Sequence, residues 1–65
     1  MVQINGEEKE NYDGVTVDEM VEREGFQKSR IAVEINGAIV SKQIYHDTII
    51  HSGDVIEVVS FVGGG

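Results

Sequence analysis

The stretch that decides the fold is VIEVVSFV, Val55 to Val62, in which all but two residues are apolar. Apolar residues on both faces are typical of a central strand in a sheet. Three glycines follow this stretch, Gly63, Gly64 and Gly65. Because glycine has no Cβ, another protein can close tightly around such a backbone, and we expect the Gly65 carboxylate to be the working group. The alternative is a frayed end without a function.

The amino-terminal segment predicts a β-hairpin. Val2 and Ile4 alternate with polar residues, which is the pattern of a half-buried strand. Asn5-Gly6 then supplies the positive φ angles of a tight turn. We expect a short return strand through Lys9 to Tyr12.

A helix is predicted after this hairpin. Thr16 and Glu19 offer a capping box, in which the hydroxyl and the carboxylate satisfy exposed amides of the helix start. Gly25 followed by Phe26 predicts a left-handed stop, which gives a helix of about ten residues. The apolar residues that share one helical face are Val17, Met20 and Val21.

The strongest hairpin signal lies further along the chain. Ile31–Ile35 places branched apolar residues on one face, and Asn36-Gly37 turns the chain into Ala38–Val40. The pattern loosens from Ser41 to Ile50 before the last strand. The order strand, strand, helix, strand, strand, strand predicts an α+β domain, a mixed sheet of about five strands with one main helix packed on one face.

The composition excludes several classes of protein. A chain of 65 residues makes one domain close to the lower size limit for a single core, and 40% hydrophobic residues argue against a disordered chain. The absence of cysteine excludes disulfides, thiolate metal sites and a thiol nucleophile. The net charge of -7 repels phosphate backbones and anionic membranes, so we expect no nucleic-acid or membrane partner. The same field favours a positively charged protein surface.

The chain has no segment that predicts a signal peptide or a spanning helix, and we expect a cytoplasmic protein. His46 and His51 lie near Asp47 and Asp54, but a single short loop offers no fixed geometry for three ligands. We therefore expect surface histidines and no metal site. The carboxylates of Glu7, Glu8, Glu10, Glu22 and Glu24 are interpreted as a solvated face.

Four groups of residues together resemble a known family. They are Ile35-Asn36-Gly37-x-x-Val40 at the second hairpin, the aromatic Tyr45, Gly53-Asp54-x-Ile56-Glu57 at the last strand, and the terminal Gly64-Gly65. At this spacing they resemble the ubiquitin-like β-grasp fold and, in detail, the ThiS/MoaD family of sulfur carriers. The resemblance covers the whole chain and implies a β-grasp domain over residues 1–62 and a flexible glycine tail over residues 63–65.

This resemblance also implies a function. The Gly65 carboxylate is expected to be adenylated by a ThiF-like, ATP-dependent enzyme and converted to a thiocarboxylate with sulfur from a donor protein. The thiocarboxylate then donates sulfur to a ThiG-like thiazole synthase in thiamine biosynthesis. The chain is thus expected to be a co-substrate and not an enzyme, with no permanently bound cofactor and with ATP used by its activating partner.

The short tail implies that the domain docks closely on its partners. Gly63, Gly64 and Gly65 span at most about 10 Å when extended. We predict a docking patch beside this tail, formed by Val59, Phe61 and Val62. The alternative is that Val59 and Phe61 are ordinary packing for the second face of the sheet.

Three other functions stay open at this level. One is the small subunit of molybdopterin synthase, which uses the same thiocarboxylate chemistry. Another is a ubiquitin-like modifier that forms isopeptide bonds through Gly65. The last is a β-grasp domain that binds noncovalently and whose glycines have no chemistry.

Overall fold

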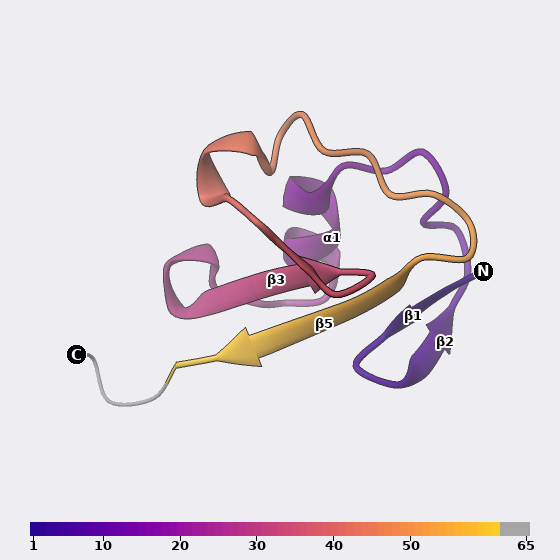
Figure 1. Ribbon diagram of the computed structural model, residues 1–65, viewed down its shortest axis with the longest axis horizontal. Coiled ribbons are helices and arrows are strands. Elements are labelled where there is room, and N and C mark those ends of the chain that lie inside the picture. The colour runs from indigo at the N-terminus through magenta and orange to yellow at the C-terminus, as the bar shows by residue number, and fades with distance from the viewer. Residues whose placement is uncertain (62–65) are drawn as a thin grey trace.

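The computed structural model describes residues 1–61, so the predictions for Val62, Gly63, Gly64 and Gly65 lie outside the described residues. Figure 1 shows one sheet with a helix packed against it. The strands are β1 (Val2–Ile4), β2 (Glu7–Lys9), β3 (Ile31–Ile35), β4 (Ala38–Val40) and β5 (Val55–Ser60). The helix α1 spans Val17–Arg23, and two short 3₁₀ helices span Lys28–Arg30 and Lys42–Ile44.

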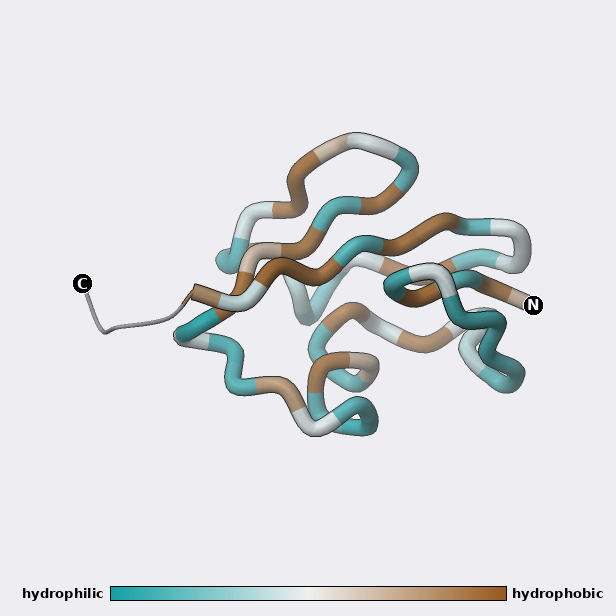
Figure 2. The backbone as a smooth tube through the Cα atoms, turned by 90° about the horizontal axis from the view of Figure 1, so that it is seen from below, coloured by the Kyte–Doolittle hydropathy of each residue, from teal (hydrophilic) through white to brown (hydrophobic). Residues whose placement is uncertain are grey.

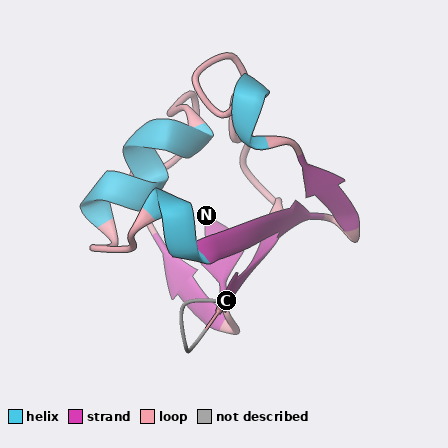
Figure 3. Cartoon of the chain, turned by 90° about the vertical axis from the view of Figure 1, so that its left-hand side faces the viewer, coloured by secondary structure: helices cyan, strands magenta, loops and turns pink. Residues whose placement is uncertain are grey.

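The first and the last described strands, β1 and β5, are neighbours in the sheet. Its strand order is β2-β1-β5-β3-β4, which places β5 at the centre. β5 runs parallel to β1 and antiparallel to β3. The predicted mixed sheet and the central position of the last strand are therefore confirmed. In Figure 3 the helical segments lie on one side of this sheet.

Both Asn-Gly turns form as predicted. Asn5 and Gly6 have φ angles of 50° and 82°, and Asn36 and Gly37 have 52° and 86°. Two successive residues at positive φ are typical of a type I′ turn, whose twist matches that of the flanking strands. These turns therefore fix the β1–β2 and β3–β4 hairpins locally.

The return strand is shorter than predicted. β2 ends at Lys9 and does not continue to Tyr12. Asn11 has a φ of 70°, which breaks the extended backbone. Tyr12 then turns into the core, where it is 5% exposed, and its hydroxyl donates a hydrogen bond to Glu24 Oε2 at 2.5 Å. Burial of this aromatic ring outweighs the continuation of an edge strand.

The start of α1 confirms half of the predicted capping box. Thr16 is the N-cap, and its Oγ1 accepts a hydrogen bond from the Glu19 backbone N–H at 3.1 Å. The reciprocal half is wrong, because the Glu19 carboxylate pairs with the Arg23 guanidinium one turn later, with Nε at 3.0 Å. An ion pair at i and i+4 competes successfully for this carboxylate.

The end of α1 follows the prediction, although the helix has seven residues and not about ten. Gly25 has a φ of 78°, and its N–H donates to the Glu22 carbonyl at 3.1 Å. The Phe26 N–H donates to the Val21 carbonyl at 3.0 Å. This pair of bonds is a Schellman motif, which closes the helix and turns Phe26 back towards the core.

The core lies between α1 and the sheet. Figure 2 shows apolar residues both in strands and in connections of the backbone, with hydrophilic residues between them. The buried side chains are Val2, Ile4, Tyr12, Val17, Met20, Val21, Ile31, Val33, Tyr45, Ile50, Ile56 and Val58. Tyr45 and Ile50 come from the segment with the loosest pattern, yet both are fully buried.

That segment is held by the turn that precedes α1. The Ile50 N–H donates to the Val15 carbonyl at 2.8 Å, and the Gly14 N–H donates to the Ile50 carbonyl at 2.8 Å. The Val17 N–H donates to the Thr48 carbonyl at 2.9 Å. These long-range bonds bring the irregular segment over the core and complete it. None of the helices described for residues 1–61 is long and apolar enough to cross a membrane.

Candidate docking surface at the end of β5

The two faces of β5 lie in different environments. Ile56 and Val58 point towards α1 and are 0% and 8% exposed. Val55, Val59 and Phe61 point away from it and are 41%, 50% and 56% exposed. A second layer over this side of the sheet is absent from the described residues, so Val59 and Phe61 are not buried packing. We call this side of the sheet the outer face.

The strand register defines the neighbours on the outer face. Val59 lies opposite Ala32 on β3, and Glu57 lies opposite Glu34 on the same strand. Glu34 in turn lies opposite Ile39 on β4, and Ile39 is 75% exposed. The outer face of β3, β4 and β5 is therefore an exposed apolar surface with two carboxylates at its centre.

The end of β5 has a fixed position. Val59 and Ser60 pair with Ala32 and Ile31 on β3. One residue later, the Phe61 N–H donates to the Arg30 carbonyl at 2.7 Å. The pairing with β3 thus ends at Ser60, and a backbone hydrogen bond to the residue just before β3 holds Phe61 in place. Two residues of the predicted docking patch, Val59 and Phe61, lie together at this end, and the third, Val62, is outside the described residues.

The two turn asparagines also hold β5 from both sides. Asn36 Oδ1 accepts a hydrogen bond from the Val55 N–H at 2.9 Å, and Asn36 Nδ2 donates to Asp54 Oδ1 at 3.0 Å. On the other side, Asn5 Oδ1 accepts from the Val58 N–H at 2.7 Å. Each side-chain amide bonds to β5 just beyond the last residue that the neighbouring strand pairs with. Sequence reasoning assigned these residues to turns alone, because nothing in the local pattern indicates that both turns adjoin β5.

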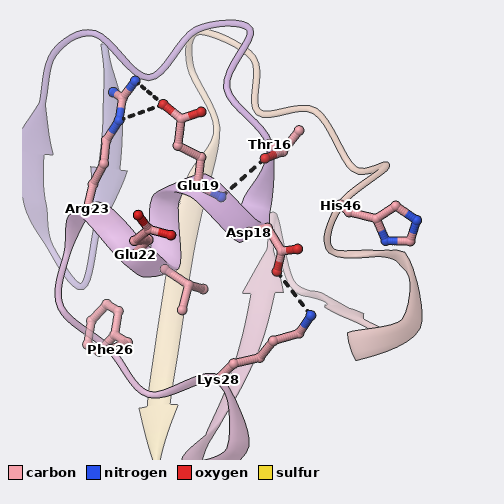
Figure 4. Close-up of a pocket in the computed structure, with 9 residues that line it drawn as sticks. Thr16, Asp18, Glu19, Glu22, Arg23, Phe26, Lys28 and His46 are labelled. Carbon is pink, nitrogen blue, oxygen red and sulfur yellow. Dashed lines mark hydrogen bonds and ion pairs between the residues drawn. The ribbon is translucent and has the colours of Figure 1, made fainter.

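A shallow hollow lies on the helix side of the domain, and Figure 4 shows the side chains around it. Lys28 Nζ lies 3.1 Å from Asp18 Oδ1, and the Arg23 guanidinium binds Glu19. These charges neutralise one another in solvent. The predicted solvated face is confirmed for the exposed residues Glu7, Glu8, Glu10 and Glu22. It is wrong for Glu24, whose side chain is 18% exposed because it binds Lys9 and the Tyr12 hydroxyl. His46 also lines the hollow and is exposed, as predicted for a surface histidine. Within residues 1–61 no group of three or more ligating side chains could hold a metal ion.

Tyr12 anchors the helix side. Burial and the hydrogen bond to Glu24 raise the pKa of Tyr12 to about 12. The Arg23 guanidinium lies 5.2 Å from the centre of the Tyr12 ring, and Lys9 Nζ lies 3.6 Å from Glu24 Oε1. This cluster joins α1 to the segment after β2. It is a structural anchor, because the Tyr12 ring is buried and its hydroxyl binds Glu24 at the end of α1.

Comparison with known proteins fits this architecture. The ThiS family model matches residues 2–65. The chain belongs to the ThiS family. The fold agrees, since the crystal structure of the thiamine biosynthesis protein ThiS from Geobacter metallireducens superposes with a TM-score of 0.80 at 25% identity, over 98% of this chain and 97% of that one. The predicted ubiquitin-like β-grasp fold is thereby confirmed.

Two relatives are similar to this chain along most or all of its length. The chain is 36% identical to the sulfur carrier protein ThiS of Bacillus subtilis over 66 residues, which cover 100% of both chains. It is 39% identical over 62 residues to a thiazole synthase of Paramagnetospirillum magneticum. The match covers 95% of this chain but only 19% of that enzyme. A segment similar to this ThiS-family chain thus forms part of a much longer protein.

Proposed function

We propose that this ThiS-family protein is a sulfur carrier of thiamine biosynthesis that carries sulfur on the carboxyl group of Gly65. The observation that carries the proposal is the match to the ThiS family over residues 2–65, which includes all three terminal glycines. Further support comes from the similarity to the Bacillus subtilis carrier along both whole chains.

The chemistry requires activation of the carboxylate. At neutral pH a terminal carboxylate is ionised and does not react with nucleophiles. A ThiF-like enzyme joins it to the α-phosphorus of ATP, with release of pyrophosphate, to form an acyl-adenylate. Hydrosulfide supplied by a donor protein then attacks the carbonyl carbon, the C–O bond to AMP breaks, and AMP leaves, so that the carbonyl carbon carries sulfur as a thiocarboxylate. The chain contains no cysteine that could capture the activated carbonyl as an internal thioester.

The recipient in this proposal is a ThiG-like thiazole synthase. Support comes from the thiazole synthase of Paramagnetospirillum magneticum, of which a segment similar to this chain makes up 19%. A shared polypeptide keeps a carrier close to the site that consumes its sulfur. The present chain acts in this proposal as a co-substrate in the cytoplasm, with ATP bound by its partner.

The fold determines how closely a partner must approach. The Phe61 N–H is bonded to the Arg30 carbonyl next to β3, and Gly65 lies four residues further along the sequence. Four residues span at most about 14 Å when fully extended. The end of β5 must therefore dock at the mouth of the partner's active site. Val59, Phe61 and Val62 are the docking patch that we propose for this contact.

The test is the intact mass of the purified chain after incubation with ATP, its activating enzyme and a sulfur source. We expect a gain of about 16 Da, and alkylation of the product distinguishes a thiocarboxylate from oxidation of methionine. A variant that lacks Gly64 and Gly65 keeps every core side chain and should remain folded but unmodified. An unchanged mass with an enzyme that is active on another carrier protein contradicts the proposal.

A further inference from the structure

Two acidic side chains meet at the centre of the outer face. Glu34 on β3 and Glu57 on β5 are direct cross-strand partners, so their side chains project from the same side of the sheet. Like charges in this position destabilise a sheet. Within residues 1–61 neither carboxylate takes part in an ion pair. We call Glu34 and Glu57 the acidic pair.

The basic side chains that form ion pairs do so elsewhere. Lys9, Arg23 and Lys28 bind carboxylates of β2, α1 and the residues next to them. The acidic charges of the helix side are thus partly neutralised within the domain. In the free protein the two carboxylates of the acidic pair therefore repel each other. A lysine at position 34 or 57 would replace this repulsion by an attraction.

Exposed apolar side chains flank the acidic pair. Ile39 on β4 lies opposite Glu34. Val59 follows two residues after Glu57 on the same side of β5. Ile39 is 75% exposed, Val59 is 50% exposed, and Phe61 at the end of the row is 56% exposed. A partner that covers these apolar side chains also removes water from the two carboxylates. Carboxylates that lose water without gaining a cation carry a large energetic cost.

We propose that the outer face of β3, β4 and β5 docks on an enzyme surface that places an arginine side chain between Glu34 and Glu57. Apolar side chains of the same surface then cover Ile39, Val59 and Phe61. A guanidinium suits this position, because its planar fork can donate to two carboxylates at once. This inference rests on the proposed function, since the enzyme in question is the thiazole synthase that receives the tail beyond Phe61.

A second copy of the chain does not fit this surface. In a two-fold dimer through the outer face, the acidic pair of one chain would approach that of the other. The net charge of -7 on each chain adds to this repulsion. The combination of an apolar surface and uncompensated carboxylates therefore selects a basic partner and rejects self-association.

The test uses E34Q/E57Q and E57K in the full-length chain. In the free chain, both variants should raise the melting temperature by about 2–5 °C, since E34Q/E57Q removes a like-charge pair and E57K creates an opposite-charge pair. Affinity for the thiazole synthase of the same organism, measured by calorimetry, should fall by about tenfold for E34Q/E57Q and by more for E57K. Higher salt should weaken binding of the wild type more than binding of E34Q/E57Q.

The matched control is E10Q/E22Q, which removes two exposed carboxylates outside the outer face. It should bind the thiazole synthase within about twofold of the wild type. Equal losses in E10Q/E22Q and E34Q/E57Q would mean a general effect of net charge and would overturn the inference. Unchanged affinity of E34Q/E57Q overturns it as well, as does a wild-type dimer in sedimentation that I39S abolishes.

The result is separable from the proposed function, which is tested by the mass of the wild-type chain. If that mass does not change while E34Q/E57Q still loses affinity, the docking surface stands and the sulfur chemistry fails. If the wild type gains sulfur while E34Q/E57Q binds normally, the proposed function stands and the docking surface is wrong.

Discussion

The inner and outer faces of β5 carry similar side chains in opposite environments. Ile56 and Val58 lie under α1 and exclude water, whereas Val59 and Phe61 on the other side are half exposed. Burying an apolar side chain of this size contributes about 1.5–3 kcal/mol. The inner residues therefore stabilise the fold, and the outer residues leave about half of that contribution unused in the free domain. Apolar surface that the fold does not need is available to a partner.

The largest effect on stability is expected on the inner face. Ile56→Ala removes a fully buried side chain from the central strand. The transfer term and the cavity together should lower the free energy of unfolding by about 2–5 kcal/mol, which approaches the whole stability of a domain of this size. Urea denaturation followed by circular dichroism measures this loss. The matched change on the outer face is Val59→Ala, which should lower the free energy of unfolding much less. An equally large loss for Val59→Ala would show that both faces of β5 stabilise the fold to the same extent.

The next effect comes from the Tyr12 anchor on the helix side. The pKa of Tyr12 is raised from 10.0 to about 12, so between these pH values the folded chain keeps a proton that the unfolded chain loses. Stability from this group is thus present below pH 10 and is lost as the pH rises towards 12, by up to about 2 kcal/mol.

The measurement is thermal unfolding at a series of pH values from 9 to 12, with Tyr12→Phe as the control. The phenylalanine variant should lack this component of the alkaline decline. Parallel stability curves for the two proteins would show that the hydroxyl does not titrate with a raised pKa.

A smaller effect is expected where Asn36 holds the start of β5. Asn36→Ala removes the side-chain oxygen that accepts from the Val55 N–H. It also puts alanine at a φ of 52°, where no side-chain hydrogen bond offsets the steric cost of its Cβ. We expect a loss of about 1–1.5 kcal/mol in denaturant titration. Asn36→Gly keeps the backbone conformation and should recover part of this loss. No difference between the two variants would mean that backbone strain contributes nothing at this turn.

The smallest change in stability is expected on the outer face, together with a large change in binding. Phe61→Ser should alter the free energy of unfolding by less than about 0.5 kcal/mol, because the ring is exposed in the free domain. Affinity for the thiazole synthase should fall about tenfold or more, as for other exposed aromatic anchors. Lost folding with unchanged affinity would show that Phe61 belongs to the core and not to the docking patch.

The parts of the fold that follow from local rules could be predicted from the sequence. Asn5-Gly6 and Asn36-Gly37 need positive φ, and Gly25 ends α1 for the same reason. The end of β2 and the burial of Tyr45 were not predictable, because both depend on contacts with distant residues. Tyr45 in particular lies in a segment without periodicity, which long-range hydrogen bonds carry over the core.

The candidate site shows the same limit. The glycine tail and the apolar residues near it are visible in the sequence. An apolar residue on a strand does not reveal which face another element covers, so the exposure of Val59 and Phe61 required the structure. The acidic pair was also hidden, since Glu34 and Glu57 lie 23 positions apart and only the register of β3 and β5 brings them together.

The central position of β5 has a consequence for synthesis on the ribosome. The hairpins β1–β2 and β3–β4 are not adjacent in the sheet, and β5 alone joins them. The strand that completes the sheet is also the last strand to be made. Without β5 the two hairpins share no strand pairing, and the core lacks Ile56 and Val58. Within residues 1–61, the pairing of the two hairpins into one sheet therefore waits for β5, so a partner that binds the end of β5 meets a sheet that is already complete.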